Sequence, residues 1–185
     1  SKSELEKIKT IGVTGTKGKS TTTSMIHHVL NNCGFNAFLG GNIGIPPLSL
    51  WPDIKKATLQ KHDADKPIVV VLEMSSHQLS DAVSSPNIAV VLDIEPEHLD
   101  YYSSFDEYIK AKTQITRFQT NKDLVIFDDD NEIPTKLANL GKAKQVTFGL
   151  TKNIRKNANN AEKSIIYKDE EIINTDQLPV RGKHN

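Results

Sequence analysis

The residues with the clearest chemical potential form a glycine- and lysine-rich run near the start of the chain. Gly15 and Gly18 are followed at once by Lys19 and Ser20, and an apolar stretch typical of a strand precedes them. Glycines let backbone N–H groups converge on an anion, and the N-terminus of a following helix adds a favourable dipole. Such a lysine can reach the β- and γ-phosphates of a nucleotide, while the serine hydroxyl can ligate Mg²⁺. The run predicts a variant phosphate-binding loop, because Val13 stands where the usual pattern has glycine; an ordinary strand-to-helix turn is the alternative.

A carboxylate and an imidazole each follow a predicted buried strand. Glu73 ends one apolar run, and His98 comes shortly after another. The carboxyl ends of parallel strands face the ligand crevice of an open α/β sheet, so these side chains are expected near each other. A carboxylate there is well placed for a cation beside phosphates, whereas imidazole is an atypical Mg²⁺ ligand. A solvated strand-end acid and a structural or exposed histidine are the alternatives.

A lysine occupies an apolar helical stripe. Lys112 lies four residues after Tyr108 and three before Ile115, on the side of the helix that its apolar neighbours define. A lysine on an inward stripe is unfavourable unless it snorkels, pairs or is modified. Snorkelling of the amine to water is the simplest of these explanations.

The elements that must position these residues alternate between short apolar strands and amphipathic helices. This alternation predicts an α/β fold with a mostly parallel sheet flanked by helices. A polar, Asn-rich stretch is expected to be a mobile loop at residues 151–163, and a small β appendage is expected near the C-terminus, with a hairpin of 165–167 and 171–173. We expect strands at 8–14, 35–39, 68–73, 87–94, 124–127 and 145–148, and helices at 19–33, 48–61, 75–84, 104–118 and 131–140.

Composition narrows the class of protein. The chain has 185 residues, with 23 Lys plus Arg against 23 Asp plus Glu, and this zero balance argues against binding of duplex nucleic acid. No apolar run approaches the ~20 residues needed to span a bilayer. The single cysteine, Cys33, excludes an internal disulfide and fits a reducing, cytoplasmic location. The chain begins with Ser1 and ends without a natural stop pattern, so we expect a fragment of a larger protein.

Several segments, taken in order, resemble the central, ATP-binding domain of the Mur ligases, which is P-loop NTPase-like. The phosphate loop resembles their Gly-Thr-x-Gly-Lys-[Ser/Thr] pattern. The later segments most resemble the branch that adds D-glutamate to UDP-N-acetylmuramoyl-L-alanine. They are Gly-Gly-Asn-Ile-Gly-Ile-Pro at 40–46, Leu-Glu-Met-Ser-Ser-His-Gln-Leu at 72–79, Glu-His-Leu-Asp at 97–100, Tyr108-x-x-Ala111-Lys112, and Arg-Gly-Lys-His-Asn at 181–185.

The resemblance implies roles for particular residues. Catalysis is implied for Lys19, His98 and Lys112. Two Mg²⁺ ions are implied, the first held with Ser20 and the second with Glu73, His98 and a carbamylated Lys112. Asn42, Ser75 and Ser76 are implied to face the UDP-sugar substrate. The residues implied to bind ATP are Gly15, Thr16, Lys17, Gly18, Lys19, Ser20, Thr21 and Asn185.

The resemblance also implies a reaction and partners. ATP would phosphorylate the substrate carboxylate, and the amine of D-glutamate would attack the acyl phosphate, in peptidoglycan precursor synthesis. An N-terminal UDP-binding domain and a C-terminal amino-acid-binding domain would be absent from residues 1–185, so the isolated chain is expected to bind Mg-ATP weakly without ligating. Four positions depart from the family pattern, namely Lys17, His77, Asp93 and Glu97.

Other functions remain open at this stage. Another Mur ligase or a folylpolyglutamate synthetase-like ligase would share the phosphate loop and the lysine. A nucleotide-binding P-loop module without ligase chemistry would leave Lys112 as a plain snorkelling lysine. A purely structural α/β module has no use for the phosphate loop, Glu73, His98 and Lys112 together.

Overall fold

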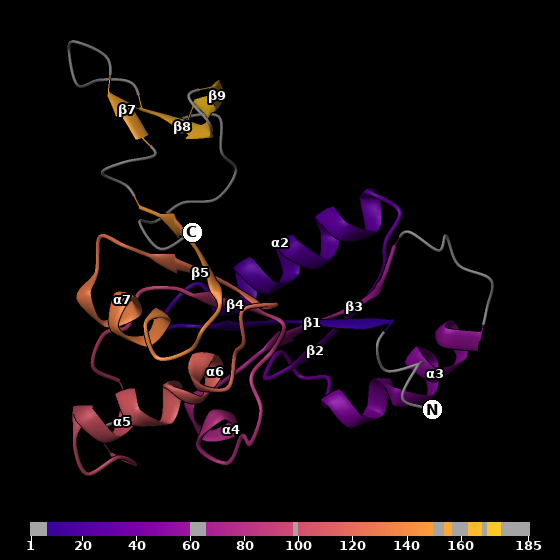
Figure 1. Ribbon diagram of the computed structural model, residues 1–185, viewed down its shortest axis with the longest axis horizontal. Coiled ribbons are helices and arrows are strands. Elements are labelled where there is room, and N and C mark those ends of the chain that lie inside the picture. Colours follow the sequence, from indigo (N-terminus) through magenta and orange to yellow (C-terminus); the bar gives the residue numbers. More distant parts are fainter. Residues whose placement is uncertain are drawn as a thin grey trace.

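A six-stranded parallel sheet forms the centre of the protein in the computed structural model, which describes residues 7–59, 66–97 and 100–149 and the backbone of three further strands (Figure 1). The strand order is β2-β3-β1-β4-β5-β6, and every neighbouring pair is parallel. The predicted α/β class is therefore confirmed. The strands are β1 (Ile8–Thr14), β2 (Asn36–Gly41), β3 (Ile68–Glu73), β4 (Ile88–Val91), β5 (Leu124–Asp128) and β6 (Lys144–Phe148).

Both faces of the central strands are covered, which explains why their sequences are apolar without alternation. Val69 and Val71 of β3 pack with Ile26 and Leu30 of α2 (Lys19–Asn32), and α2 covers that face. Ile68, Val70 and Leu72 point to the opposite face, where α3 (Trp51–Leu59) packs on them. Figure 1 shows α2 on one side of the sheet and α3 on the other.

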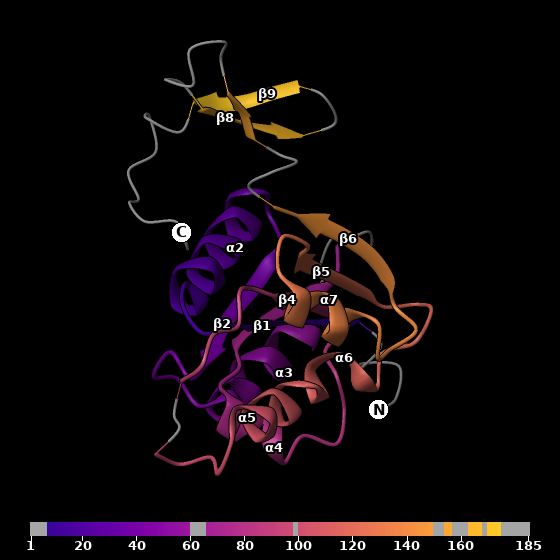
Figure 2. The same cartoon turned by 90° about the vertical axis from the view of Figure 1, so that its left-hand side faces the viewer.

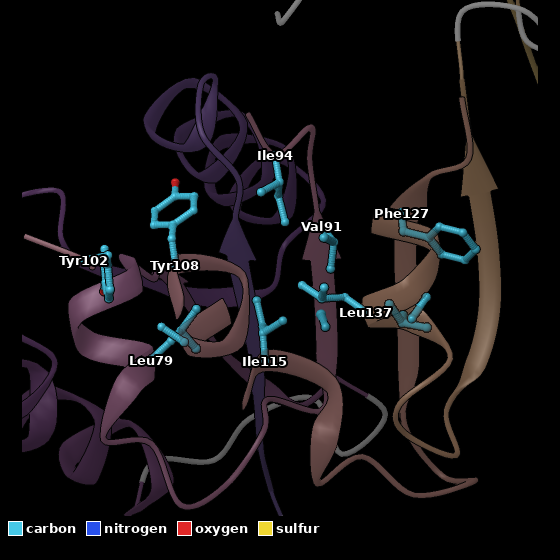
Figure 3. Close-up of a cluster of buried hydrophobic side chains, with 12 residues drawn as sticks. Leu79, Val91, Ile94, Tyr102, Tyr108, Ile115, Phe127 and Leu137 are labelled. Atoms are coloured by element: carbon cyan, nitrogen blue, oxygen red, sulfur yellow. The ribbon is translucent and has the colours of Figure 1, made fainter. Parts of the chain in front are cut away.

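The largest buried cluster lies on the α3 side of the sheet and joins β4 and β5 to four helices. Leu79, Ile115 and Leu137 come from three of these helices and are almost fully buried (Figure 3). The hydroxyl of Tyr108 points away from Leu79 and Ile115 in Figure 3, out of the apolar cluster. The remaining helices are a 3-10 turn η1 (Pro47–Leu50), α4 (Ser76–Ser80), α5 (Phe105–Lys112), α6 (Gln114–Arg117) and α7 (Glu132–Ala138).

A glycine cap ends α2. Gly34 has a φ of 76°, which glycine adopts without strain. Its N–H donates to the Asn31 carbonyl at 2.9 Å, and the Phe35 N–H donates to the Leu30 carbonyl at 3.0 Å. This pair of bonds is the Schellman motif, which turns the chain back toward β2.

Several predicted element boundaries are wrong. The helix predicted at 75–84 ends at Ser80, and the strand predicted at 87–94 ends at Val91. Two further differences have a clear physical reason. β2 runs on past its predicted end at residue 39, because Gly40 and Gly41 pair with Leu72 and Glu73 of β3. The helix expected over 104–118 is interrupted at Thr113, whose hydroxyl donates to the Lys110 carbonyl at 2.7 Å. Such a side-chain bond competes with the regular helical pattern.

The region after β6 contains a second, antiparallel sheet, which Figure 1 and Figure 2 show apart from the six-stranded sheet. It has the order β7-β8-β9, with strands Ile154–Lys156, Lys163–Tyr167 and Glu170–Asn174. The predicted hairpin is confirmed. The predicted loop over 151–163 is wrong at β7, because residues 154–156 pair with β8; the rest of that loop lies outside the described residues.

Among the residues that the structure describes, none of the helices is both long and apolar enough to cross a membrane. This agrees with the absence of a long apolar run in the sequence.

Gly41→Ala is expected to lower the free energy of unfolding by about 2–4 kcal/mol, because the new Cβ would overlap the backbone of Glu73. Gly44→Ala is the matched control. Gly44 also has a positive φ, of +95°, but nothing lies within 4 Å of a Cβ built there. The control should therefore lose only the ~1–2 kcal/mol of backbone strain. Urea unfolding of both variants measures the difference, and equal losses would contradict a close approach at Gly41.

Candidate active site at the carboxyl ends of the strands

The loops that follow β1 and β4 meet where the strand order changes direction, which is the usual ligand crevice of an open α/β sheet. The Thr16 N–H donates to the Asp93 carbonyl at 2.8 Å. The Thr16 hydroxyl donates to the Glu95 carbonyl at 3.0 Å and accepts from the Glu95 N–H at 2.8 Å. Three hydrogen bonds therefore fix the phosphate loop against the segment after β4.

The loop itself has the features of an anion site at the start of α2. Gly18 has a φ of 77°, and α2 begins directly after it with no side-chain cap. The first N–H groups of the helix are thus left for a ligand. A Cβ at Gly15 would lie 2.7 Å from that of Leu92, so only glycine fits there. The Lys19 amine folds back on the loop and donates to the Thr16 carbonyl at 2.6 Å, while Ser20 is exposed.

Glu73 is a buried carboxylate with one unused oxygen. Its side chain is only 2% exposed at the end of β3. Oε1 accepts from the Asn42 side-chain amide at 3.1 Å, whereas Oε2 has no hydrogen-bond partner among the described residues. A buried, unpaired carboxylate oxygen is unfavourable unless a cation or donor reaches it. The predicted alternative of a solvated strand-end acid is therefore wrong.

The Lys112 amine does not snorkel to water. The side chain is 1% exposed, and Nζ donates to the Gly15 carbonyl at 3.0 Å and to the Thr14 hydroxyl at 3.3 Å. It also lies 4.6 Å from the ring centre of Tyr108. The lysine on the inward stripe of α5 thus ends against the phosphate loop, and the snorkelling alternative is wrong.

Burial changes the protonation of two groups at this point. The pKa of Lys112 falls to about 7, chiefly because burial disfavours the cation and further because the Lys19 charge repels it, while Glu97 opposes the shift. Burial likewise raises the pKa of Tyr108 to about 12, and the Glu97 charge adds to this. The Tyr108 hydroxyl lies 3.3 Å from that of Thr16, which partly opposes the shift, and with a pKa of about 12 it stays protonated near neutral pH. With a pKa of about 7, a substantial fraction of Lys112 is the neutral, nucleophilic amine near neutral pH.

The serines expected to face the substrate lie just after β3. The Ser75 hydroxyl accepts from the Gln78 N–H at 3.3 Å, and the Gln78 side chain accepts from the Ser75 N–H at 3.1 Å. This capping box begins α4, and Ser76 is buried within it. The Ser75 side chain therefore caps α4, and Ser76 begins the helix.

Three of the positions that depart from the family pattern have contacts of their own. Lys17 forms an exposed ion pair with Glu95 at 3.7 Å. The pKa of Asp93 is raised, first by burial and then by the Glu95 charge. His77 packs edge-on against Tyr101, with 4.3 Å between ring centres.

Two predicted site residues, His98 and Asn185, lie outside the described residues. Within the described part, no group of three or more His, Cys, Asp or Glu side chains could hold a metal ion. A cation at Glu73 would need further donors, such as a modified lysine or a residue outside the described ranges. Thr14 was missed by the sequence analysis, although a polar residue ending an apolar strand, next to the loop, was the available signal.

Lys112→Met is expected to raise the free energy of unfolding by about 1–4 kcal/mol below pH ~7, without Mg²⁺ or dissolved CO₂. The amine is protonated in both states there, so the folded state carries the full unfavourable burial of the charge. Between about pH 7 and pH 10.5 only the unfolded state keeps the proton, so raising the pH disfavours the unfolded state. The free energy of unfolding of the wild type therefore rises with pH in this range, and its difference from that of Lys112→Met shrinks. Urea unfolding across this pH range measures it. Lys110→Met, at an exposed position of α5, is the control; a difference that did not change with pH would contradict a lowered pKa.

Comparison with known sequences identifies relatives over nearly the whole chain. The family model described as the Mur ligase middle domain matches residues 13–185. The UDP-N-acetylmuramoylalanine--D-glutamate ligase of Acetivibrio thermocellus is 38% identical over 177 residues, which cover 94% of this chain and 36% of the relative. The protein of the same name from Streptococcus equi subsp. zooepidemicus is 38% identical over 176 residues, with 95% and 36% covered. The chain thus spans about 36% of the length of these relatives.

Solved structures with low sequence identity share the fold. UDP-N-acetylmuramate:L-alanyl-gamma-D-glutamyl-meso-diaminopimelate ligase from Neisseria meningitides aligns with a TM-score of 0.60 at 17% identity, over 97% of this chain and 58% of that chain. MurF ligase from Thermotoga maritima, solved in complex with ADP, gives a TM-score of 0.57 at 19% identity, over 88% and 39%. With the sequence match extending over residues 13–185, the chain belongs to the Mur ligase family, as a middle domain.

Proposed function

We propose that the protein carrying this chain uses ATP to join D-glutamate to UDP-N-acetylmuramoyl-L-alanine, in peptidoglycan precursor synthesis. The names of its relatives support this choice of substrates. Because the chain spans about 36% of their length, we assign the UDP-binding and amino-acid-binding parts to flanking domains on its N- and C-terminal sides.

The observation that carries the proposal is the buried Lys112 amine, 3.0 Å from the carbonyl of Gly15 in the phosphate loop. A cation there would repel the Lys19 amine and the Mg²⁺ ions that accompany a nucleotide. In our proposal the neutral amine attacks the carbon of CO₂, an N–C bond forms, and a proton leaves. The product is a carbamate, whose oxygens suit Mg²⁺. The lowered pKa of Lys112 favours this modification.

The phosphate loop would hold ATP by its backbone and by two lysines. Lys19 would exchange its 2.6 Å bond to the Thr16 carbonyl for the β- and γ-phosphates, since it lies at the start of α2. The exposed Lys17 would add positive charge beside the loop. The set proposed for ATP is completed by Gly15, Thr16, Gly18, Ser20 and Thr21, with Asn185 near the nucleotide base.

The site at the carboxyl ends of the strands would also hold two Mg²⁺ ions. Ser20 would hold the first, and Glu73, His98 and carbamylated Lys112 would hold the second. The buried Oε2 of Glu73 supports this assignment, because it has no hydrogen-bond partner in the described part of the chain and can donate to a cation. Bound there, Mg²⁺ supplies neutralisation of the charge on the transferring phosphoryl group.

The reaction would proceed in two transfers on the substrate. The carboxylate of UDP-N-acetylmuramoyl-L-alanine forms an O–P bond to the γ-phosphorus as ADP leaves. The amine of D-glutamate then attacks the acyl carbon, loses a proton, and displaces phosphate. Lys19 would balance the charge on the phosphoryl oxygens, and Asn42, Ser75 and Ser76 would orient the substrate side.

The alternatives left open by the sequence are less favoured. A P-loop module without ligase chemistry does not account for membership of a ligase family. Another Mur ligase or a folylpolyglutamate synthetase-like enzyme would share the chemistry, but the relatives at 38% identity are D-glutamate ligases. A cytoplasmic location stays a prediction.

With the flanking domains present, we expect phosphate release from Mg-ATP and UDP-N-acetylmuramoyl-L-alanine with D-glutamate, and not with other amino acids. Lys19→Ala should lower kcat by at least ~100-fold, because it removes a charge that stabilises the transferring phosphoryl group. A coupled assay of phosphate measures both. Release with a different amino acid would instead indicate the activity of another Mur ligase. Ligation by the isolated 185 residues would contradict the assignment of flanking domains.

A carbamate on Lys112 should appear as a bicarbonate-dependent carbonyl signal in ¹³C NMR when ¹³CO₂ is supplied. The signal should be lost in Lys112→Gln, because the amine is removed. It should persist in Lys110→Gln, which changes an exposed lysine of the same helix. A signal that survived Lys112→Gln would place the modification elsewhere.

A further inference from the structure

We propose that Asn42 is a positioning residue for Glu73: its side-chain amide engages one carboxylate oxygen and leaves the other as a single donor to Mg²⁺. The inference rests on the proposed function, because it assigns this task within the same site. It adds to the contact with the UDP-sugar that resemblance alone implies for Asn42.

The backbone holds Asn42 beside Glu73 independently of its side chain. Gly41 pairs with Glu73 at the end of the β2–β3 ladder, and the Asn42 N–H extends the ladder by donating to the Glu73 carbonyl at 2.9 Å. A Cβ at Gly41 would overlap the Glu73 backbone. The close approach of β2 and β3 therefore places residue 42 opposite Glu73, whatever its side chain.

The side-chain contact then divides the carboxylate. Asn42 Nδ2 donates to Glu73 Oε1 at 3.1 Å. Glu73 Oε2 is buried and has no hydrogen-bond partner among the described residues. An amide is a neutral donor, so it fixes the carboxylate without cancelling its charge. Oε1 is thereby occupied by the amide, and Oε2 is left as the oxygen that binds the cation.

The exposure of the two residues fits this division of roles. Glu73 is 2% exposed, whereas Asn42 is exposed at the rim of the crevice. The amide thus lies on the solvent side of the carboxylate and limits its rotation toward water. Groups that orient metal ligands in this way typically change metal affinity 10–100-fold when they are removed, by order of magnitude.

The test titrates Mg²⁺ calorimetrically into the 185-residue chain in the presence of a non-hydrolysable ATP analogue and bicarbonate, so that binding of the second ion is read as well as that of the first. We expect Asn42→Ala to raise the Mg²⁺ concentration at the midpoint of the second step about 10–100-fold, with affinity for the analogue in the absence of Mg²⁺ unchanged. Asn42→Leu, which keeps the approximate shape but has no donor, should give the same shift. Asn32→Ala is the matched control, because Asn32 is exposed and bonds to His28 at the far end of α2.

A double-variant cycle separates positioning from packing. Glu73→Gln should also raise the midpoint, and adding Asn42→Ala to it should produce no further shift. Additive shifts, a shift in Asn42→Ala but not in Asn42→Leu, or an unchanged midpoint in both would overturn the role of Asn42. An unchanged midpoint in Glu73→Gln would instead overturn the proposed metal site at Glu73, and the role of Asn42 with it.

Discussion

The burial of the Lys112 amine against the phosphate loop is the constraint on which the rest of this site depends. Nζ donates to a carbonyl and a hydroxyl at the end of β1, and its side chain comes from α5. The strand and the helix must therefore keep a fixed distance, which the Tyr108 ring under the amine and the buried cluster beneath it maintain. The phosphate loop and α5, which carries Lys112, are therefore held in fixed positions relative to each other.

The sheet order makes this arrangement possible. With β1 between β3 and β4, the loop after β1 lies beside the end of each neighbour. Glu73 arrives from β3, and the Asp93 and Glu95 backbone groups arrive from the segment after β4. Parallel pairing sends all three strand ends to one edge, so anionic, cationic and backbone donor groups meet there without a dedicated subdomain.

The same groups are unfavourable for the stability of the folded chain. A buried amine weakens the folded state, and so does a buried carboxylate oxygen that has no hydrogen-bond partner among the described residues. Residues that break the local rules of a core in this way are typical of functional sites. Mg²⁺ and a carbamate, which we propose for this site, would relieve both effects, because the carbamate replaces the buried cation and Mg²⁺ neutralises the carbamate and the carboxylate. Asn42 fits this view, since it holds Glu73 in place without removing its charge.

The sequence by itself determined the alternation of strands and helices, the phosphate loop, and the anomaly of a lysine on an apolar stripe. These are local signals, because periodicity, glycine spacing and helix capping act within about one or two turns or a strand. It did not determine where the Lys112 amine ends, because its partner Gly15 lies 97 positions away. Nor did it show that Asn42 meets the Glu73 carboxylate, because the two are 31 positions apart and only the β2–β3 register brings them together. Likewise, Gly40 and Gly41 look like a turn in isolation, and only pairing with β3 makes them a strand. Tertiary structure decided the partners of each polar atom, since burial and sheet order, rather than local preference, choose which donors and acceptors can reach one another.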